Sequence, residues 1–311
     1  MSPAIAVIDV GSNSIKVLVA TGDGVGGVVP LLGKTIDTRI GAGINQTPPR
    51  LGEEGTTAGL AAIQQLLADA AAFSPVRVML VATSAVRDAA NGAEFAARVR
   101  RETGCELRIL SGEEEANGIG RGLTCDPALA GLANFYVFDL GGGSLECLGF
   151  LERDVQQAIS LPLGCVRLTE KFVSDPTAPI RAVTGNRIMA HTRTVMAESG
   201  FRFDLPDATA VATGGTATTA RAIYGAGTNR AVDATSSLIS VRQLREQLDQ
   251  IAPLTLEQRR RVPGLPPERA DVYPAALATL IAVAETGGLY SYRHSFYNLR
   301  YGLAAELLAG L

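Results

Sequence analysis

One nine-residue pattern occurs twice in this chain. AVIDVGSNS, at residues 6–14, and YVFDLGGGS, at residues 136–144, each run from an apolar strand through an aspartate and a glycine turn to a serine. The two aspartates, Asp9 and Asp139, are separated by 139 − 9 = 130 positions. An internal duplication is the economical explanation, and it favours a fold built from two related halves.

Segments with strand and helix patterns alternate around both copies. Apolar runs predict strands at 4–10, 15–20, 25–34, 76–82, 107–110, 136–140, 145–151, 157–161 and 208–213. Helical spacing predicts helices at 57–71, 93–102, from 111 onward, 166–172, 181–198 and 301–311. From residue 220 onward the chain reads as mainly helical, with a Pro-rich loop at 263–271. The alternation predicts an α/β fold, and 311 residues suffice for two domains.

Composition narrows the chemistry. The formal net charge is -3, so no overall positive field attracts a polyanion, nucleic acid is not an expected partner, and any anion site must be local. The four cysteines form no CxxC pair, which argues against a zinc cage and suits a reducing cytosol. His191 and His294 are the only histidines, so carboxylates must supply acid–base groups. No secretion signal or membrane span is recognisable, and we expect a cytoplasmic protein.

Glycine turns follow both repeated strands, and a third glycine-hydroxyl turn is expected at 213–219. Glycine permits positive φ and close backbone approach, so that successive N–H groups can point at a phosphate oxygen. A single turn of this kind is more often an ordinary hairpin. Three of them predict phosphate binding by Gly11, Ser12, Asn13, Ser14, Gly141, Gly142, Gly143, Ser144, Gly214, Gly215 and Thr216.

Three acids are candidates for a metal. Asp9 and Asp139 end apolar strands, where an isolated carboxylate is costly to bury. Each could simply cap its own turn. Beside phosphate loops, they could instead hold a hydrated Mg²⁺ that bridges phosphate oxygens. Glu146 lies two positions after Ser144 and so points to the same face, which makes it a further candidate for metal or water.

The run SGEEEA, residues 111–116, predicts a helix start with Ser111 as the N-cap and Glu114 closing a capping box. Acidic side chains in the first turn also stabilise the helix by interacting favourably with the positive end of its dipole. Three adjacent glutamates exceed that need, and one could act as the general base for an attacking water. Spacing alone does not choose among Glu113, Glu114 and Glu115.

Several cations could contact phosphate, although a solvated surface side chain is the usual fate of a lone arginine. These cations are Arg87 after a predicted strand, Arg167 and Lys171 after LPLGC, and Arg300 near the end of the chain. Arg259, Arg260 and Arg261 could guide a polyanion or form a solvated helix face.

Eight blocks give the chain a resemblance to a known family. They are VIDVGSNSIKVLVA, VATSAVRDAANGAEF, ILSGEEEANGIGRGL, VFDLGGGSLECLGF, LPLGCVRLTEKF, VATGGTATTARAI, VPGLPPERADVYPAAL and NLRYGL. In this order they resemble the exopolyphosphatase / guanosine pentaphosphate phosphatase family over about residues 6–303. The family belongs to the actin, sugar kinase and heat-shock chaperone ATPase superfamily, so the resemblance implies two duplicated RNase H-like domains around a central cleft. We expect the domains at 1–122, completed by a helix at 300–311, and at 123–299.

The resemblance also implies an activity and its residues. Family members remove terminal phosphate from inorganic polyphosphate, and some from guanosine pentaphosphate, with Mg²⁺. The family's catalytic base falls at Glu115 and the arginine of its TSAxR motif at Arg87. Its phosphate loops and acids fall at Asp9 and Gly11 to Ser14, and at Asp139, Gly141 to Ser144 and Glu146.

The chain departs from longer members of that family in length. Those continue past the NLRYGL block into a helical domain of the histidine-aspartate phosphohydrolase type, whereas about eight residues follow it here. The chain therefore resembles the short, two-domain branch, and its processivity and chain-length preference stay open. So does its oligomeric state, for which a homodimer is one expectation. A kinase of the same superfamily and a non-catalytic sensor of polyphosphate or nucleotide are the rival functions.

Overall fold

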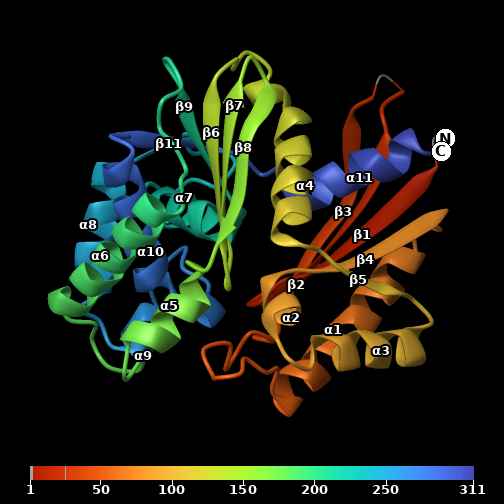
Figure 1. Cartoon of the computed structure of the whole chain (residues 1–311), viewed down its shortest axis with the longest axis horizontal. Helices are drawn as coiled ribbons and strands as arrows, with labels where there is room; N and C mark the ends of the chain where they lie inside the picture. Colours follow the sequence, from red (N-terminus) through yellow and green to blue (C-terminus); the bar gives the residue numbers. More distant parts are fainter. Residues whose placement is uncertain (1–2, 25) are drawn as a thin grey trace. The chain divides into compact units, whose positions relative to one another are not determined.

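The computed structural model describes residues 3–24 and 26–311. By internal contacts the chain forms two compact units, one of Met1–Gly131 with Tyr297–Leu311 and one of Leu132–Phe296. The domain borders that we expect at residues 122 and 299 remain a prediction. Each unit is an α/β layer structure, which confirms the predicted fold class (Figure 1).

The first unit is built on a five-stranded sheet of order β3-β2-β1-β4-β5. Its strands are β1 Ala4–Val10, β2 Ser14–Gly22, β3 Val28–Asp37, β4 Arg77–Ala82 and β5 Leu107–Ile109. Its helices are α1 Glu53–Ala71, α2 Ser84–Asp88, α3 Gly92–Thr103, α4 Gly112–Thr124, the 3-10 helix η1 Pro127–Leu129 and α11 Leu299–Ala309. The strand predicted at 25–34 begins later than expected, and Val25 itself lies outside the described residues.

Strand β1 is buried on both faces, as its unbroken apolar run predicts. Ala6, Ile8 and Val10 belong to a core that also takes in residues of α1 and α3. Helix α11 contacts β1, β2 and β3, and it packs closely against α4 (Figure 1). The C-terminal helix thus belongs to the first unit.

Glycines allow α4 and α11 to approach each other. A Cβ atom built on Gly302 would lie 1.9 Å from the carbonyl oxygen of Gly118, and one on Gly122 would lie 2.1 Å from that of Asn298. Any side chain at these positions would force the helices apart. Since α4 carries SGEEEA at its N-terminus, this close contact helps to hold the acidic turn in place.

The second unit is built on a six-stranded sheet of order β10-β11-β9-β6-β7-β8. Its strands are β6 Phe135–Leu140, β7 Leu145–Leu151, β8 Asp154–Leu161, β9 Thr209–Thr213, β10 Leu238–Ser240 and β11 Ser291–His294. Its helices are α5 Cys165–Phe172, α6 Ala182–Glu198, α7 Gly214–Gly227, α8 Val241–Ile251, α9 Leu256–Arg259, the 3-10 helix η2 Pro267–Arg269 and α10 Tyr273–Thr286. Helix α10 packs against α5, α6 and α8 (Figure 1). Residues Tyr273–Ala284 of α10 are all buried, as expected of a helix that is apolar all round.

The two sheets share one topology. In each, the first three strands form antiparallel neighbours, β1-β2-β3 and β6-β7-β8, and the first strand pairs in parallel with the fourth, β4 or β9. On its other side the fourth strand pairs in parallel with one more strand, β5 in one unit and β11 in the other. This agreement confirms the duplication inferred from the repeated sequence pattern.

Two parts of the second half differ from the prediction. Strands β10 and β11 lie in the stretch that we expect to be mainly helical. Both are short, with three and four residues, so neither has enough length for a recognisable alternation. The predicted third turn is the first turn of α7, which begins directly after β9. None of the helices in the described part of the chain combines the length and apolar character needed to span a bilayer.

Candidate functional site

The chemistry-bearing residues of the first unit gather where its parallel strands end. Strand β1 leads into the GSNS turn, β4 into α2 with Arg87, and β5 into the N-terminus of α4 with Glu115. Backbone bonds join these endings, because Thr83 N donates to Val10 O and Leu110 N donates to Ala82 O. The carboxyl ends of parallel strands are the usual place for a ligand in an open α/β sheet.

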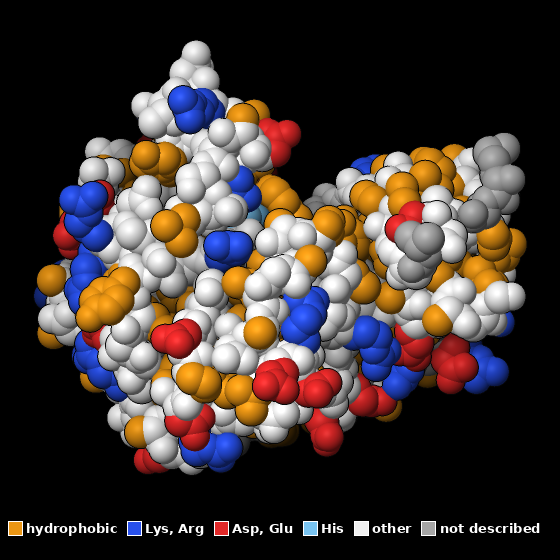
Figure 2. All heavy atoms as spheres, turned by 90° about the horizontal axis from the view of Figure 1, so that it is seen from above, with side chains coloured by type: hydrophobic (Ala, Val, Ile, Leu, Met, Phe, Trp, Pro, Cys, Tyr) orange, Lys and Arg blue, Asp and Glu red, His pale blue; other side chains and the backbone are white. Residues whose placement is uncertain are grey.

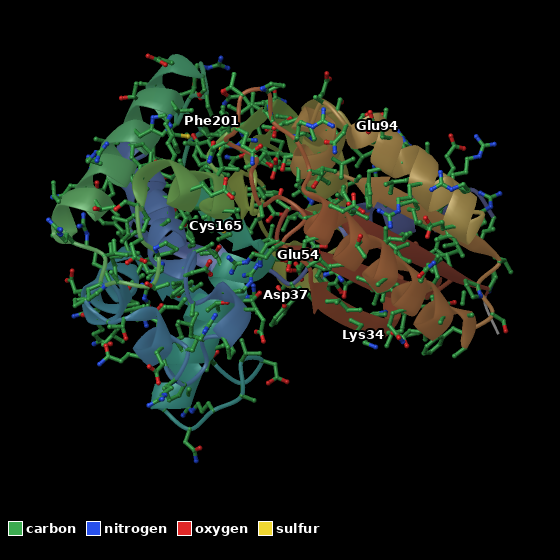
Figure 3. All side chains as sticks on the ribbon, turned by 90° about the horizontal axis from the view of Figure 1, so that it is seen from below. Lys34, Asp37, Glu54, Glu94, Cys165 and Phe201 are labelled. Carbon is green, nitrogen blue, oxygen red and sulfur yellow. The ribbon has the colours of Figure 1, made fainter. Side chains whose placement is uncertain are left out.

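The GSNS turn is closed by Gly11 N donating to Ser14 O at 3.2 Å. Ser12 Oγ lies 3.1 Å from Ser84 Oγ at the start of α2, and Asn13 Nδ2 donates to Asp37 Oδ1 at 3.2 Å. Asp37, at the end of β3, is labelled in Figure 3. These bonds fix the turn to two other elements of the same unit.

Three polar atoms at this turn are buried without a hydrogen-bond partner among the described residues: Asp9 Oδ1, Asn13 Oδ1 and Ser14 Oγ. Buried polar groups in folded proteins are nearly always satisfied, so such a group calls for an explanation. A bound water molecule or cation would supply the missing partners. The predicted phosphate-binding residues Asn13 and Ser14 and the predicted metal ligand Asp9 thus lie together here.

Lys16, which was not among the predicted site residues, lies opposite Asp9 in the β1–β2 ladder. Directly opposed residues of an antiparallel pair project to the same face. The Lys16 Nζ lies 3.9 Å from where a Cβ on Gly11 would be, so the ammonium group is beside the GSNS turn. The sequence repeat could have indicated Lys16 as a site residue, because Lys16 lies two positions past Ser14 just as Glu146 lies two positions past Ser144.

Glu115 and Arg87 are brought together in the first unit. Arg87 Nη1 donates to Glu115 Oε2 at 2.7 Å and to the carbonyl oxygen of Leu110 at 3.2 Å. The Glu115 side chain is buried, with 8% exposure. The structure therefore distinguishes Glu115 from Glu113 and Glu114, a choice that sequence spacing alone could not make.

Glu113 and Glu114 differ from Glu115 in their surroundings. Glu113 is exposed. Glu114 completes the predicted capping box, with Ser111 N donating to its Oε2 at 2.8 Å. That backbone hydrogen bond, followed by the one from Arg108, lowers the pKa of Glu114. Glu114 has a structural role, and Glu115 is the buried acid of the three.

The second unit repeats the turn of the first. Gly141 N donates to Ser144 O at 3.0 Å, which matches the bond between Gly11 and Ser14. Neither Gly11 nor Gly141 has a positive φ, so of the two properties of glycine only close backbone approach applies here. Close approach explains them better, because a Cβ on Gly11 would lie 3.1 Å from Ser14 O.

Helix α5 is packed directly onto the GGGS turn. Cys165 N and Val166 N donate to the carbonyl oxygens of Gly141 and Gly142. Arg167 Nε donates to Gly143 O at 2.8 Å. A Cβ on Gly164 would lie 2.3 Å from Gly142 O, so only glycine allows this contact. Cys165, labelled in Figure 3, marks the start of the helix.

Asp139 and Glu146 lie directly opposite each other in the β6–β7 ladder, at the register that Asp9 and Lys16 occupy in the first unit. Glu146 is 2% exposed, and its Oε1 accepts a hydrogen bond from Ser160 Oγ at 2.8 Å. No set of three or more His, Cys, Asp or Glu side chains arranged for a metal is found among residues 3–24 and 26–311. Mg²⁺ commonly takes one or two carboxylates and fills its remaining positions with water and substrate phosphate. The pair Asp139 and Glu146 fits that donor set.

Gly214 and Gly215 begin α7 beside Asp139. Gly214 has a φ of +83°, and a Cβ there would lie 2.3 Å from Asp139 Oδ1. A Cβ on Gly215 would lie 1.9 Å from Arg269 Nη1. Arg269, from η2 in the predicted Pro-rich loop, is a second cation that the sequence analysis did not single out. Thr216 is buried in the same helical turn.

His294 contacts two residues of α7 and is neutral near pH 7. His294 Nδ1 lies 2.8 Å from Arg221 Nη1, and Nε2 lies 3.1 Å from Thr218 Oγ1. Burial and then the charge of Arg221 lower the pKa of His294 to about 3. Arg221 also donates to Thr235 O. The group supports α7 and is not a source of protons near neutral pH.

Of the other predicted cations, Arg259 proves to be structural. Arg259 is fully buried and donates to the carbonyl oxygens of Leu254, Ala270, Pro176 and Ala178. The hypothesis that it guides a polyanion on the surface is therefore wrong. Arg300 Nη1 donates to the carbonyl oxygen of Val17.

Surface charges are mixed. In Figure 2, acidic and basic side chains are interspersed on the face that is drawn. This agrees with the net charge of -3 and with the expectation that any anion site is local.

Comparisons with known proteins agree with this architecture. The model of the Ppx/GppA phosphatase family matches residues 18–309. Exopolyphosphatase 1 of Mycobacterium tuberculosis is 29% identical over 279 residues, a match that covers 86% of this chain and 77% of that protein.

Two solved structures are also similar. The Ppx/GppA family member of Aquifex aeolicus has 26% identity and a TM-score of 0.79, with coverage of 100% of this chain and 99% of that one. An exopolyphosphatase from Cytophaga hutchinsonii has a TM-score of 0.88 at 21% identity, with coverage of 99% and 98%, and this likeness supports the fold alone.

Proposed function

Since this chain belongs to the Ppx/GppA phosphatase family, we propose that it is an exopolyphosphatase, which releases terminal orthophosphate from inorganic polyphosphate. The observation that carries the proposal is the buried Glu115 carboxylate, held by Arg87 at the ends of the parallel strands. The name of the relative from Mycobacterium tuberculosis supports the same substrate class.

Glu115 is proposed as the general base. It accepts a proton from a water molecule as the water oxygen bonds to the terminal phosphorus. The bond from that phosphorus to the bridging oxygen breaks, the shortened chain leaves with the bridging oxygen, and orthophosphate is the second product. Arg87 holds the carboxylate in place and adds positive charge near the reacting group. Phosphoryl transfer depends mostly on such positioning and electrostatics.

Mg²⁺ is proposed as the cofactor, held by Asp139 and Glu146. When bound, it would offset negative charge on phosphate oxygens. Ser160 orients Glu146 through its hydroxyl group. Asp9 was predicted as a third ligand, but a lysine stands opposite it in the ladder. We therefore assign Lys16 and the GSNS turn to phosphoryl binding, and we assign the metal to the acidic pair.

The remaining phosphate-binding assignments are also proposals. They comprise Gly11, Ser12, Asn13, Ser14, Gly141, Gly142, Gly143, Ser144, Gly214, Gly215 and Thr216. Their support is the repeated turn geometry and the unsatisfied atoms at the first turn. Guanosine pentaphosphate is proposed as a second substrate, a homodimer as the assembly, and the cytoplasm as the location. Four free cysteines are compatible with that location.

The proposed function is tested by measuring orthophosphate release from long polyphosphate, tripolyphosphate and guanosine pentaphosphate with Mg²⁺. We expect release from polyphosphate, which EDTA abolishes. The kinase alternative predicts phosphate transfer from ATP to an acceptor without polyphosphate hydrolysis. The sensor alternative predicts tight binding without release of phosphate.

A further inference from the structure

A small pocket of the second unit contains a buried arginine that the proposed mechanism does not use. The pocket is a hollow of about 220 Å³ that opens to solvent, and side chains of α7, α8 and β10 line it. Arg221, in the middle of α7, is among them and is only 5% exposed. These elements belong to one compact unit, so the pocket is complete within that unit.

The guanidinium group of Arg221 is incompletely hydrogen-bonded. Nη1 lies 2.8 Å from His294 Nδ1, and Nη2 donates to Thr235 O at 2.6 Å. Nε is buried and has no hydrogen-bond partner among the described residues. A buried N–H group without an acceptor is rare in folded proteins and calls for an explanation.

The charge of Arg221 is also uncompensated. Within the described part of the chain no carboxylate forms an ion pair with it, and the Phe296 ring, whose centroid is 5.3 Å from Cζ, offsets only part of the charge. Burial lowers the pKa of Arg221, and the charge of the exposed Asp233 only partly offsets that effect. A buried charge without a counter-charge is costly, and a bound anion would remove that cost.

His294 does not neutralise this charge. Thr218 Oγ1 donates to Gly214 O at 3.0 Å, so it accepts a hydrogen bond from His294 Nε2. The other ring nitrogen, Nδ1, is then the acceptor for Arg221. The imidazole is neutral in this arrangement, and the guanidinium group keeps its full positive charge.

The other polar side chains of the pocket offer hydrogen-bond donors. Gln243 Oε1 already accepts from Ser240 N, so the amide nitrogen of Gln243 remains to donate. Ser236 Oγ accepts from Leu238 N, so its hydroxyl proton remains to donate. Tyr224 adds an exposed ring with a hydroxyl group. Since the described lining includes no acidic side chain, one cation surrounded by neutral donors suits an anion.

We propose that this hollow, which we name the Arg221 pocket, binds a small inorganic oxyanion, and that orthophosphate is its ligand. An oxyanion can accept hydrogen bonds from the guanidinium group and from the neutral donors at the same time. The hollow is smaller than the roughly 300–1,000 Å³ of most organic-ligand sites, so it is too small for a nucleotide. Orthophosphate is the product of the proposed reaction, so the choice of this ion rests on the proposed function, whereas the existence of the pocket does not.

The Arg221 pocket is separate from the first turn of α7, where phosphate binding is proposed on other grounds. Arg221 lies two helical turns, about 10 Å, farther along α7 than Gly214. The hydrogen bonds from Arg221 through His294 and Thr218 to Gly214 nevertheless connect the two places. The His294 ring therefore reports on both, and a variant has to distinguish them.

The first measurement follows the ring ¹⁵N signals of His294 by NMR while orthophosphate is added. We expect a saturable shift with a Kd of roughly 1 mM or below, as a few charge-assisted hydrogen bonds would give. Sulfate, which has the same shape, should compete with phosphate. Chloride at equal ionic strength should not reproduce the shift, because a general screening effect would.

The variant Ser236→Glu would place a carboxylate in the pocket itself. Ser236 is exposed and directly follows the Thr235 carbonyl group that Arg221 binds, so a glutamate there can reach the guanidinium group. The matched control, Ser237→Glu, adds the same charge at the next exposed residue, which does not line the pocket. We expect Ser236→Glu to raise the Tm by about 2–4 °C over the control. It should also weaken the phosphate-dependent shift of His294 at least tenfold, whereas the control should retain the wild-type Kd.

An equal phosphate-dependent shift in Ser236→Glu and Ser237→Glu would place the anion elsewhere and overturn the Arg221 pocket. The absence of a saturable shift in wild-type protein would overturn it as well. Orthophosphate release from long polyphosphate, measured on the same wild-type protein, keeps the two proposals apart. A His294 shift that Ser236→Glu removes supports the pocket even if the protein releases no phosphate.

Discussion

Arg87 Nη1 lies 2.7 Å from Glu115 Oε2, and the same nitrogen donates to the carbonyl oxygen of Leu110, where β5 gives way to α4. The arginine thus ties the acid to the backbone from which its helix begins. Arginine and glutamate are 28 positions apart in the sequence. Their contact depends on β4 and β5 being parallel neighbours.

A positioning role for Arg87 has a kinetic signature. We expect Arg87→Gln to lower kcat about 10- to 100-fold with little change in KM, because the carboxylate loses its charged hydrogen bond. In the Glu115→Gln background, the same change should cost little more, since residues that act as a unit are not additive. Steady-state kinetics of the two single variants and the double variant measures this coupling. A large rise in KM with additive effects would instead indicate that Arg87 binds substrate independently of Glu115.

We expect Asp139 and Glu146 to bind a metal ion, and we expect their counterparts in the first unit, Asp9 and Lys16, not to bind one. Asp139→Asn and Glu146→Gln should each weaken Mn²⁺ binding, measured by electron paramagnetic resonance, whereas the exposed Asp154→Asn should not. Lys16→Glu would reproduce the register of the acidic pair opposite Asp9. We expect this variant to bind one additional Mn²⁺ and to gain more thermal stability from the metal than wild type, because opposed like charges destabilise a strand pair. Unchanged stoichiometry in Lys16→Glu would contradict the matched geometry.

The close crossing of α4 and α11 predicts a stability difference between two glycines. Gly302→Ala places a Cβ 1.9 Å from a backbone oxygen, so the helices must separate. We expect a loss of about 1–3 kcal/mol in the free energy of unfolding, as for other overpacked contacts. Gly185→Ala, in α6 with no atom within 4 Å of the new Cβ, should gain about 0.5–1 kcal/mol. Thermal unfolding of both variants checks this, and a neutral Gly302→Ala would refute the crossing.

The neutral histidine predicts how stability depends on pH. His294 has a folded pKa of about 3, against an ordinary value of 6.5. As the pH falls below about 6.5, the unfolded chain gains a proton that the folded chain does not, so stability declines until about pH 3. The slope from this one group is at most roughly 1.4 kcal/mol per pH unit. His294→Asn retains an acceptor for Arg221 and should flatten urea unfolding free energies measured between pH 5 and 7. His191→Asn, the matched control, should retain most of the slope.

Local patterns in the sequence predicted the strands of both repeats, the capping box at Ser111 and the α/β class. Each of these depends on residues that are close together in the chain. The register of β1 with β2 and of β6 with β7 follows from the turn between them, so the pairing of Asp139 with Glu146 was accessible from the spacing. The same spacing could have indicated Lys16.

Other features depend on contacts between distant segments. The run of three arginines predicts that Arg259 is on the surface. It is instead buried, and it donates hydrogen bonds to the carbonyl oxygens of Pro176 and Ala178, more than 80 positions away. Arg269 reaches Gly215 because a Pro-rich loop folds back onto α7. Strand β11 has the polar sequence SYRH, and its place in the sheet comes from pairing with β9 and β10. Sequence periodicity carries none of this information.

We propose that Glu115, and neither Glu113 nor Glu114, activates the attacking water. The most direct measurement is the rate of orthophosphate release from long polyphosphate by wild-type protein, Glu115→Gln and Glu114→Gln at saturating substrate. We expect a loss of about 10²- to 10⁴-fold for Glu115→Gln with polyphosphate binding preserved, and a rate near that of wild type for Glu114→Gln, whose carboxylate serves the capping box. A near-normal rate for Glu115→Gln, or an equal loss in both variants, would contradict it.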